Sequence, residues 1–205
     1  SDPAITSTPC DVSNRAAVQK LFAEAVAKLG GLDVLVNNAG VAGPTAKVED
    51  MNPEDWDGCL EICLTGQFNC TRLAVPHLRK SKNASIVNIS SAAGRLGFAM
   101  RTPYAAAKWG VIGFTKSLSI ELGPDNIRVN AVSPGTVYFE GGVWQLRQKN
   151  QPDIYQAALA RNPTGRMATP QDVANAAVFL ASPVSSFTTG SNLIVDGAIS
   201  NRVNF

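Results

Sequence analysis

Tyr104 and Lys108 are the residues whose types and spacing could do chemistry. They lie four positions apart, so on a helix they would share one face. There the ammonium would stabilise a tyrosinate and lower the pKa of the phenol below its usual value of about 10. Such a tyrosine can give or take a proton near neutral pH, which carbonyl reduction and alcohol oxidation both need. Ser91, at the end of an apolar run, could bond the same substrate oxygen. Alone, the pair could equally be a solvated contact on a helix.

Three apolar segments that run into turns accompany these residues. Leu32–Gly40 and Ile127–Gly135 each read as a buried strand followed by a turn that exposes backbone, and Leu193–Gly197 supplies a last short strand. Helical patterns alternate with the strands, which favours a parallel sheet covered on both faces. The expected helices are 14–29, 53–80, 104–122 and 171–180, and the expected strands are 34–36, 85–89, 128–132 and 192–195.

These motifs, in this order and spacing, make the chain from about Cys10 to Gly197 resemble the short-chain dehydrogenase/reductase family, particularly its 3-oxoacyl-carrier-protein-reductase-like members. The resemblance implies an α/β fold with a Rossmann-type doubly wound parallel sheet. It also implies NAD or NADP as cofactor, and hydride transfer between nicotinamide and a small-molecule carbonyl or secondary alcohol.

One part of the family pattern is absent from the sequence. Relatives begin with a glycine-rich strand–turn–helix that cradles the cofactor's pyrophosphate, and this sequence enters at what looks like the third strand, around Ile5–Asp11. We therefore expect residues 1–205 to form one N-terminally incomplete domain, lacking the first two strands and the glycine-rich turn, of a longer polypeptide. Removing those strands should also leave a bare sheet edge beside residues 34–36.

The resemblance assigns roles to the reactive residues. Tyr104 would be the general acid in reduction and the base in oxidation. Lys108 would lower the pKa of Tyr104 and bond the nicotinamide ribose, and Ser91 would orient the carbonyl. Cys63 stands where relatives carry an asparagine that helps to hold a proton-relaying water. A thiol is a weak hydrogen-bonding group, so we do not expect it to replace both functions of an amide.

Two segments resemble the family's adenosine-side contacts. Asp11 and Val12 look like the pair that contacts adenine, although Asp11 could instead cap a helix. Asn37, Asn38, Ala39 and Gly40 match a turn that steadies the central sheet or borders the adenosine ribose, and both roles remain open.

A third segment resembles the nicotinamide side. Pro134 and Gly135 should bring backbone close to the nicotinamide, with Val137 placed for carboxamide contacts. Phe139 stands where many relatives carry a threonine. Residues 136–167 are the least regular part of the chain, and we interpret them as a substrate lid with a joint at Gly141-Gly142. Its aromatic residues favour a partly apolar substrate, although a helix packed on the core would use the same residues.

Composition narrows the remaining classes. The net charge of +2 and the absence of a basic tract disfavour nucleic acid, and no apolar run is long enough to span a membrane. The four cysteines form no Cys-x-x-Cys pair, so we expect neither a metal site nor a disulfide framework, and a cytoplasmic setting fits. A noncatalytic nucleotide-binding or scaffold protein is the alternative function, favoured by Cys63 and Phe139. We expect a homodimer or homotetramer paired through the helices 53–80 and 104–122, with residues 201–205 reaching a neighbouring subunit.

Overall fold

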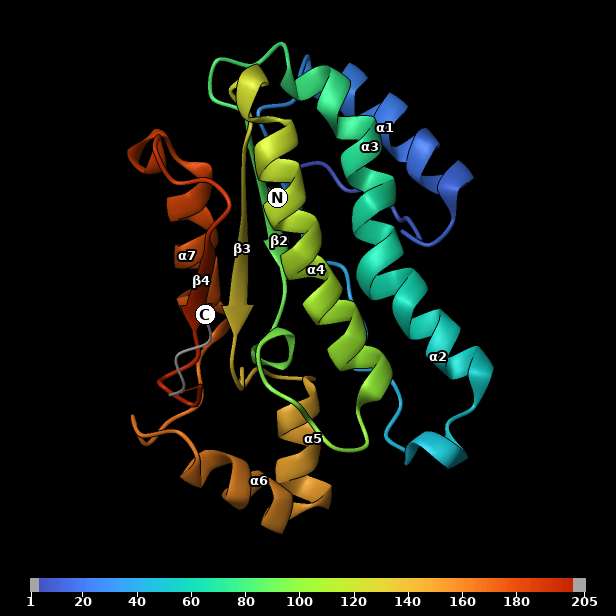
Figure 1. Ribbon diagram of the computed structural model, residues 1–205, viewed down its shortest axis with the longest axis vertical. Coiled ribbons are helices and arrows are strands. Elements are labelled where there is room, and N and C mark those ends of the chain that lie inside the picture. The colour runs from blue at the N-terminus through green and yellow to red at the C-terminus, as the bar shows by residue number, and fades with distance from the viewer. Residues whose placement is uncertain (1–3, 201–205) are drawn as a thin grey trace.

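The computed structural model describes residues 4–200, so the expected contact of residues 201–205 with a neighbouring subunit lies outside the described residues (Figure 1). Four parallel strands form one sheet in the order β1-β2-β3-β4. Their bounds are Val34–Asn37 (β1), Ser85–Ile89 (β2), Arg128–Pro134 (β3) and Asn192–Val195 (β4). The bounds of each strand differ from the predicted bounds by at most one residue, except that β3 extends two residues further than predicted.

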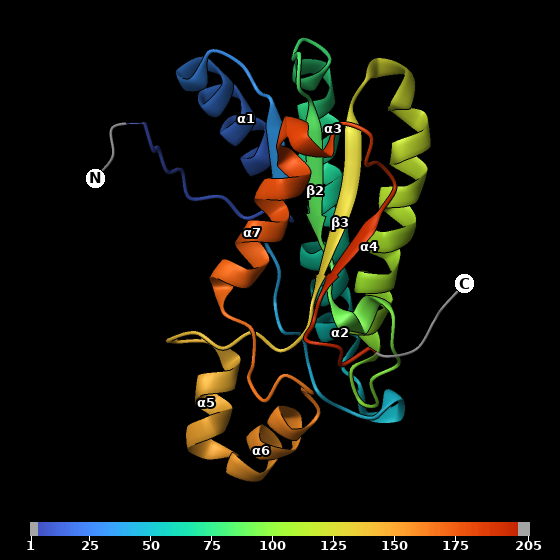
Figure 2. The ribbon, with the colours of Figure 1, turned by 90° about the vertical axis from the view of Figure 1, so that its left-hand side faces the viewer.

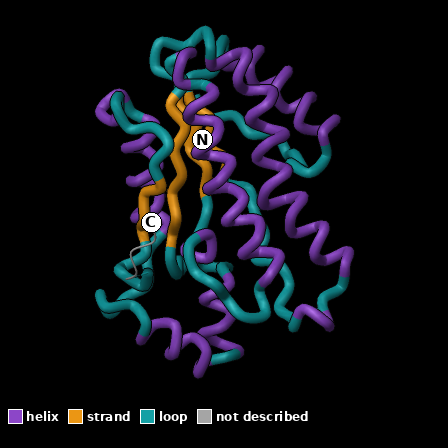
Figure 3. Tube along the Cα trace, in the orientation of Figure 1, coloured by secondary structure: helices purple, strands orange, loops and turns teal. Residues whose placement is uncertain are grey.

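The helices connect these strands in the expected alternation (Figure 3). They are α1 (Arg15–Leu29), α2 (Pro53–Leu60), α3 (Gly66–Leu78), α4 (Thr102–Glu121), α5 (Val143–Asn150), α6 (Pro152–Ala160) and α7 (Pro170–Ala181), with short 3₁₀ turns at Val48–Asp50, Ala92–Gly94, Gly123–Asp125 and Pro183–Ser185. The N-caps explain several starts, because Asn14 accepts from two backbone amides of α1 and Asn52 accepts from Glu54 N before α2.

The sheet is covered on both faces, as the alternation predicts. Helices α3 and α4 cover one face, where Leu78, Ile86, Leu118 and Val129 lie in one buried cluster (Figure 1). Helix α7 covers the other face and packs Leu180 against Val87 and Val132 (Figure 2). Strands β2 and β3 are therefore buried on both sides, although their buried positions include the polar residues Asn88, Arg128 and Asn130.

The predicted strand around Ile5–Asp11 does not form, and this expectation was wrong. The segment is irregular from residue 5 to residue 11 because no neighbouring strand among residues 4–200 pairs with it. Within residues 4–200 strand β1 pairs with β2 alone, so the bare edge expected beside it is confirmed for that range. An apolar hollow of about 280 Å³ lies there, between α1, β1 and α3.

The expected long helix 53–80 is present with an interruption that the sequence did not indicate. A π turn at Glu61–Thr65 joins α2 to α3 and carries Cys63. Such turns insert one extra residue into a helix and often occur at functional sites. Helix α4 packs closely on this turn, because a Cβ added to Gly110 would lie 2.8 Å from Leu64.

The lid is more regular than the sequence suggested. Helices α5 and α6 form within residues 136–167 and lie beyond the carboxyl ends of β3 and β4 (Figure 1). The glycine joint precedes α5, where Gly141 has a left-handed φ of 77° and Gly142 is the N-cap. No residue of α5 or α6 is buried, so neither helix adds a buried side chain to the core, and the substrate lid stays a prediction.

Within residues 4–200, no helix is long and apolar enough to cross a membrane. No group of three or more His, Cys, Asp or Glu side chains in that range is placed to hold a metal ion, and all four cysteines are free.

Candidate active site

The candidate residues gather at one edge of the sheet, where the parallel strands end. The turn Asn38–Gly40 follows β1, Ser90 and Ser91 follow β2, and Gly135 follows β3. The N-terminal half of α4 reaches the same edge and carries Tyr104 and Lys108 (Figure 2). Carboxyl ends of parallel strands are where open α/β sheets bind ligands.

The two serines after β2 have different roles. Ser90 is buried and donates its hydroxyl to the backbone oxygen of Lys108 at 2.8 Å. Ser91 is the N-cap of the following 3₁₀ turn, accepts from Ala93 N at 3.1 Å, and lines a cleft together with Tyr104. Ser90 therefore ties β2 to α4, whereas Ser91 faces the open space.

Lys108 lies behind Tyr104 and is almost fully buried, with 4% of its surface exposed. Its ammonium donates to Ile89 O at 2.9 Å and lies 5.7 Å from the centre of the Tyr104 ring. The same ammonium is 3.7 Å from where a Cβ of Gly40 would be. The structure therefore brings together Ser91, Tyr104, Lys108 and the turn after β1, as the sequence predicts.

The expected lowering of the Tyr104 pKa is not what the structure shows. Burial raises the pKa of the phenol above its usual value, and the opposing hydrogen bond with Ser91 is the second cause. The pKa of Lys108 is itself lowered, chiefly by burial, while Cys63 and Cys59 oppose that change. The Lys108 ammonium lies near the phenol as the spacing predicts, but the charge that lowers the pKa of Tyr104 is that of Arg101, and the loss of hydration on burial outweighs it.

Cys63 forms two hydrogen bonds with the backbone of one residue. Its sulfur accepts from Val41 N at 3.4 Å and donates to Val41 O at 3.5 Å. Both distances are normal for sulfur, although such bonds are weak. The thiol, fully buried in the π turn, therefore links that turn to the segment after β1 in the way that an amide side chain could.

The turn after β1 is held by its first asparagine. Asn37 is buried and donates to Thr71 Oγ1 at 3.1 Å and to Asn88 Oδ1 at 2.8 Å. Asn38, Ala39 and Gly40 are exposed at the strand end. The stabilising function therefore falls to Asn37, and the three residues after it are free to contact a ligand.

Asp11 and Val12 lie beside the same edge. The exposed carboxylate of Asp11 accepts from the amide of Ser13 at 2.9 Å and from its hydroxyl at 2.7 Å, and these bonds lower its pKa. Val12 packs against Gly66, whose added Cβ would lie 2.6 Å from it, and its carbonyl accepts from Asn69 at 3.0 Å. Asn14, not Asp11, caps the first helix.

The segment after β3 is fixed by its neighbours. Pro134 ends β3, and Gly135 packs so closely on β4 that an added Cβ would lie 2.9 Å from Asp196 Cα. Val137 pairs with Ala168 in an isolated parallel bridge. Phe139, in the position of the family's threonine, is about half exposed and packs its ring on Gly142.

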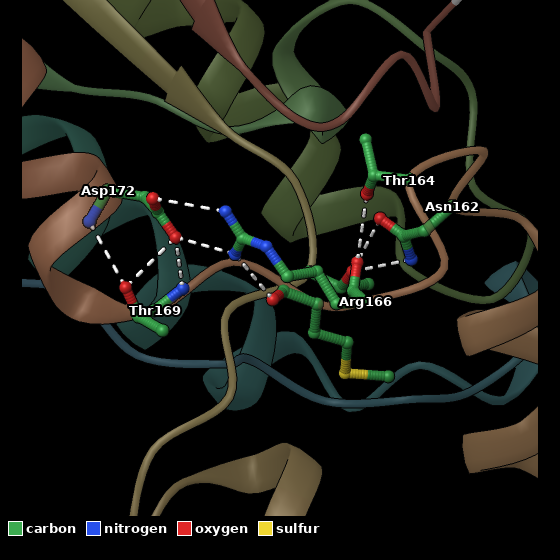
Figure 4. A network of polar contacts seen from close by, with 7 residues as sticks. Asn162, Thr164, Arg166, Thr169 and Asp172 are labelled. Atoms are coloured by element: carbon green, nitrogen blue, oxygen red, sulfur yellow. Dashed lines mark hydrogen bonds and ion pairs between the residues drawn. The ribbon is translucent and has the colours of Figure 1, made fainter.

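A network of polar contacts lies at the base of the lid (Figure 4). Arg166 donates to Asp172 Oδ2 at 2.8 Å, and Asp172 also accepts from Thr169 N at 2.8 Å as part of a capping box on α7. On the other side, Asn162 donates to Thr136 Oγ1 at 3.0 Å. The Arg166 contact attaches the end of the lid to the start of α7, and the Asn162 contact joins the segment after α6 to the start of the lid.

The sequence did not single out three arginines that line the cleft. This cleft, of about 560 Å³, lies between the strand ends and the lid, and its lining includes Ser91, Tyr104, Trp144, Arg101, Arg147 and Arg161. Only Arg101 had a signal in the sequence, because it lies three residues before Tyr104 and so on the same side of a helix.

The buried lysine provides a test of whether the residues fit a dinucleotide. Within residues 4–200 the ammonium of Lys108 has one hydrogen-bond acceptor, Ile89 O, although it carries three donors. A buried ammonium with unused donors at a strand edge fits a sugar hydroxyl, because burying such donors without a partner is costly. The nicotinamide half of the site therefore suits the cofactor that the fold implies.

Comparison with known proteins agrees with this geometry. The profile of the family described as "Enoyl-(Acyl carrier protein) reductase" matches residues 2–200. The chain is 41% identical to 3-oxoacyl-[acyl-carrier-protein] reductase of Thermotoga maritima, over 92% of this chain and 74% of that protein. It is 43% identical to trans-4-hydroxycyclohexanecarboxylate dehydrogenase of Sinomonas cyclohexanicum, over 91% and 68% respectively.

A solved structure gives the same result for the fold. Ligand-free aldohexose dehydrogenase of Thermoplasma acidophilum superposes with a TM-score of 0.87 at 32% identity, over 100% of this chain and 83% of that one. Fold and comparisons together define an NAD(P)-dependent oxidoreductase that moves a hydride between nicotinamide and a carbonyl or secondary alcohol. The chain belongs to the short-chain dehydrogenase/reductase family, and nothing in the comparisons supports the noncatalytic alternative.

Proposed function

We propose that Tyr104 moves the proton in this reaction. Its phenol gives a proton to the substrate oxygen when a carbonyl is reduced, and takes one when an alcohol is oxidised. Ser91 orients that oxygen and stabilises the charge that develops on it, and Lys108 supplies a fixed positive charge behind the ring. The observation that carries this proposal is the meeting of the Ser91 and Tyr104 hydroxyls at the cleft, with the Lys108 ammonium buried behind them.

NAD or NADP supplies or accepts the hydride when bound. We assign its nicotinamide side to Tyr104, Lys108, Pro134, Gly135 and Val137. Tyr104 and Gly135 line the cleft, the Lys108 ammonium lies near the Tyr104 ring, and the other two lie within two residues of Gly135 in the chain. We assign its adenosine side to Asp11, Val12, Asn38, Ala39 and Gly40, which lie at or beside the end of β1. The chain would act as a single dinucleotide-binding and catalytic domain that contributes residues to both sides.

The raised pKa of Tyr104 makes the two proton transfers depend differently on pH. The protonated phenol is the form that donates to a carbonyl oxygen, and burial stabilises that form. Alcohol oxidation requires the phenolate, so its rate should increase as the pH rises.

A titration of the protein with NADH and NADPH, followed by turnover of a panel of ketones and secondary alcohols, tests the proposal. We expect one cofactor to bind selectively, and the Tyr104→Phe variant to lose at least about 100-fold in kcat while binding the cofactor normally. Tyr138→Phe is the matched control, because that hydroxyl bonds Gln148 in the lid and does not line the cleft. Full turnover by Tyr104→Phe would refute the assignment of the proton to this residue.

We also propose a homodimer or homotetramer in the cytoplasm. Large apolar side chains on the outer faces of α3 and α4 support the assembly, since Phe68, Trp109 and Ile120 are 43%, 49% and 80% exposed. Val111 and Leu118, by contrast, belong to the core. Light scattering tests the assembly, and a monomer at all concentrations would contradict it. The free cysteines support a reducing compartment, which cell fractionation can test.

A further inference from the structure

The cleft beside Tyr104 is lined by three arginines and by no acidic residue. Arg101 comes from the start of α4, Arg147 from α5 and Arg161 from the residue after α6, so the positive charges face the cleft from both the core and the lid. The remaining lining is largely apolar and includes Phe98, Trp144 and Ile154.

Arg101 is held beside the reactive phenol without a counter-ion. Its guanidinium carbon lies 5.2 Å from the centre of the Tyr104 ring, and its Nη2 donates to the carbonyl of Ala42. Its Nε is buried and has no hydrogen-bond partner within residues 4–200. A buried guanidinium donor without an acceptor costs free energy, unless a bound ligand accepts its hydrogen bond.

Arg147 faces the same space from the lid. Its guanidinium carbon lies 4.9 Å from the Trp144 ring. Burial and, second, the positive charge of Arg101 lower its pKa, so the two guanidinium groups are close enough to repel each other. In the part of the chain that the structure describes, the ion pairs are Lys20–Glu24, Arg79–Asp125 and Arg166–Asp172. None of the three arginines of the cleft takes part in one.

We propose that the substrate carries a carboxylate, and that Arg101 and Arg147 bind it within the cleft. Two guanidinium groups present planar pairs of donors that match a carboxylate, and the anion would relieve their mutual repulsion. Within residues 4–200 no acidic side chain lines the cleft, so we assign the negative charge to the ligand. The inference rests on the proposed function only in naming this ligand as the substrate of Tyr104.

The position of Arg101 also limits the length of the substrate. Because its guanidinium lies over the Tyr104 ring, a bound carboxylate is only a few carbon atoms from the oxygen that Tyr104 protonates. The carbon skeleton between the two groups lies against apolar side chains of the lid, among them Trp144 and Ile154. The expected substrate is therefore a small oxo or hydroxy acid with an apolar, compact or cyclic skeleton.

Equilibrium binding tests the anion site without any turnover. Calorimetry with cyclohexanecarboxylate and with the isosteric, uncharged cyclohexanecarboxamide should show the acid to bind about 10–100-fold more tightly, the range expected for charge-assisted hydrogen bonds. Arg147→Gln should remove most of this preference. Lys149→Gln, a matched charge loss two residues further along α5 and outside the cleft, should retain it.

Turnover then tests the link to the reaction. With NADH or NADPH, 4-oxocyclohexanecarboxylate should exceed its methyl ester in kcat/KM by about 10-fold or more, mainly through KM, and Arg147→Gln should narrow that ratio. Equal binding of acid and amide, or tighter binding of inorganic phosphate than of the acid, would overturn the inference and leave the role of Tyr104 standing. Selective binding of the acid without turnover of any ketone would uphold the anion site and refute the proposed function instead.

Discussion

Replacing Cys63 by asparagine tests how a thiol serves in the place of an amide. The sulfur bonds both Val41 N, at 3.4 Å, and Val41 O, at 3.5 Å, with a single atom. Asparagine has a similar volume and offers a separate acceptor and donor, which can pair with the N–H and the C=O of one extended residue. We therefore expect Cys63→Asn to form stronger bonds with the same partner.

The structure sets the size of the effect. Cys63→Ala leaves two partly buried backbone groups of Val41 without a partner, and each such group costs about 1–3 kcal/mol. Sulfur bonds are weak, so we expect the low end for each group and a total loss of about 2 kcal/mol in the free energy of unfolding. Cys63→Asn should recover this loss and add about 1 kcal/mol over the native thiol.

Urea unfolding of the three proteins, followed by their steady-state turnover, is the assay. We expect the stability order Asn, Cys, Ala, and turnover of the alanine variant below that of the other two, because the turn after β1 borders the Lys108 ammonium. An alanine variant as stable as the native protein would show that the sulfur contacts contribute nothing. An asparagine variant less stable than the alanine variant would show that the π turn cannot seat both amide functions.

Three further outcomes are expected. Because the pKa of Tyr104 is raised above 10.0, the rate of alcohol oxidation should still increase with pH at pH 10. Ser91→Ala should move this increase to higher pH, since it removes the hydrogen bond that lowers the pKa. A rate that levels off near pH 7 would contradict this. Gly94→Ala would place a Cβ 2.6 Å from Lys108 O, so calorimetric melting should show a decrease of about 3 kcal/mol in the free energy of unfolding. Thr169→Ala removes the N-cap of α7, and urea unfolding should show a decrease of about 1 kcal/mol in the free energy of unfolding. An unchanged free energy of unfolding would show that solvent replaces the cap.

The sequence predicted the four strands and most helix ends because those features are local. Apolar runs, N-cap residues such as Asn14 and Asn52, and the Tyr104–Lys108 spacing all act within a few residues. The same reasoning failed at Ile5–Asp11, because a strand exists only when a neighbour accepts its hydrogen bonds, and no neighbour among residues 4–200 does so.

The properties of the site depended on burial and on distant segments, which a sequence does not reveal. The pKa of Tyr104 rises because its environment is desolvated, although the motif itself suggests the reverse. Arg101 and Arg147 are 46 positions apart and meet only because the lid folds back over the strand ends. The π turn around Cys63 likewise has no composition that distinguishes it from an ordinary helix.

Residues outside the reactive set hold that set in place. Asn88 donates to Thr115 Oγ1 at 3.0 Å, and Ser90 donates to the backbone of Lys108 at 2.8 Å. Together with the bond from the Lys108 ammonium to Ile89 O at 2.9 Å, these contacts fix the position of α4 along β2. A shift of α4 by one residue would break all three bonds and rotate Tyr104 away from Ser91, since a helix turns about 100° per residue. The alignment of helix and strand therefore precedes the chemistry, and it is set by buried side chains that never touch the substrate.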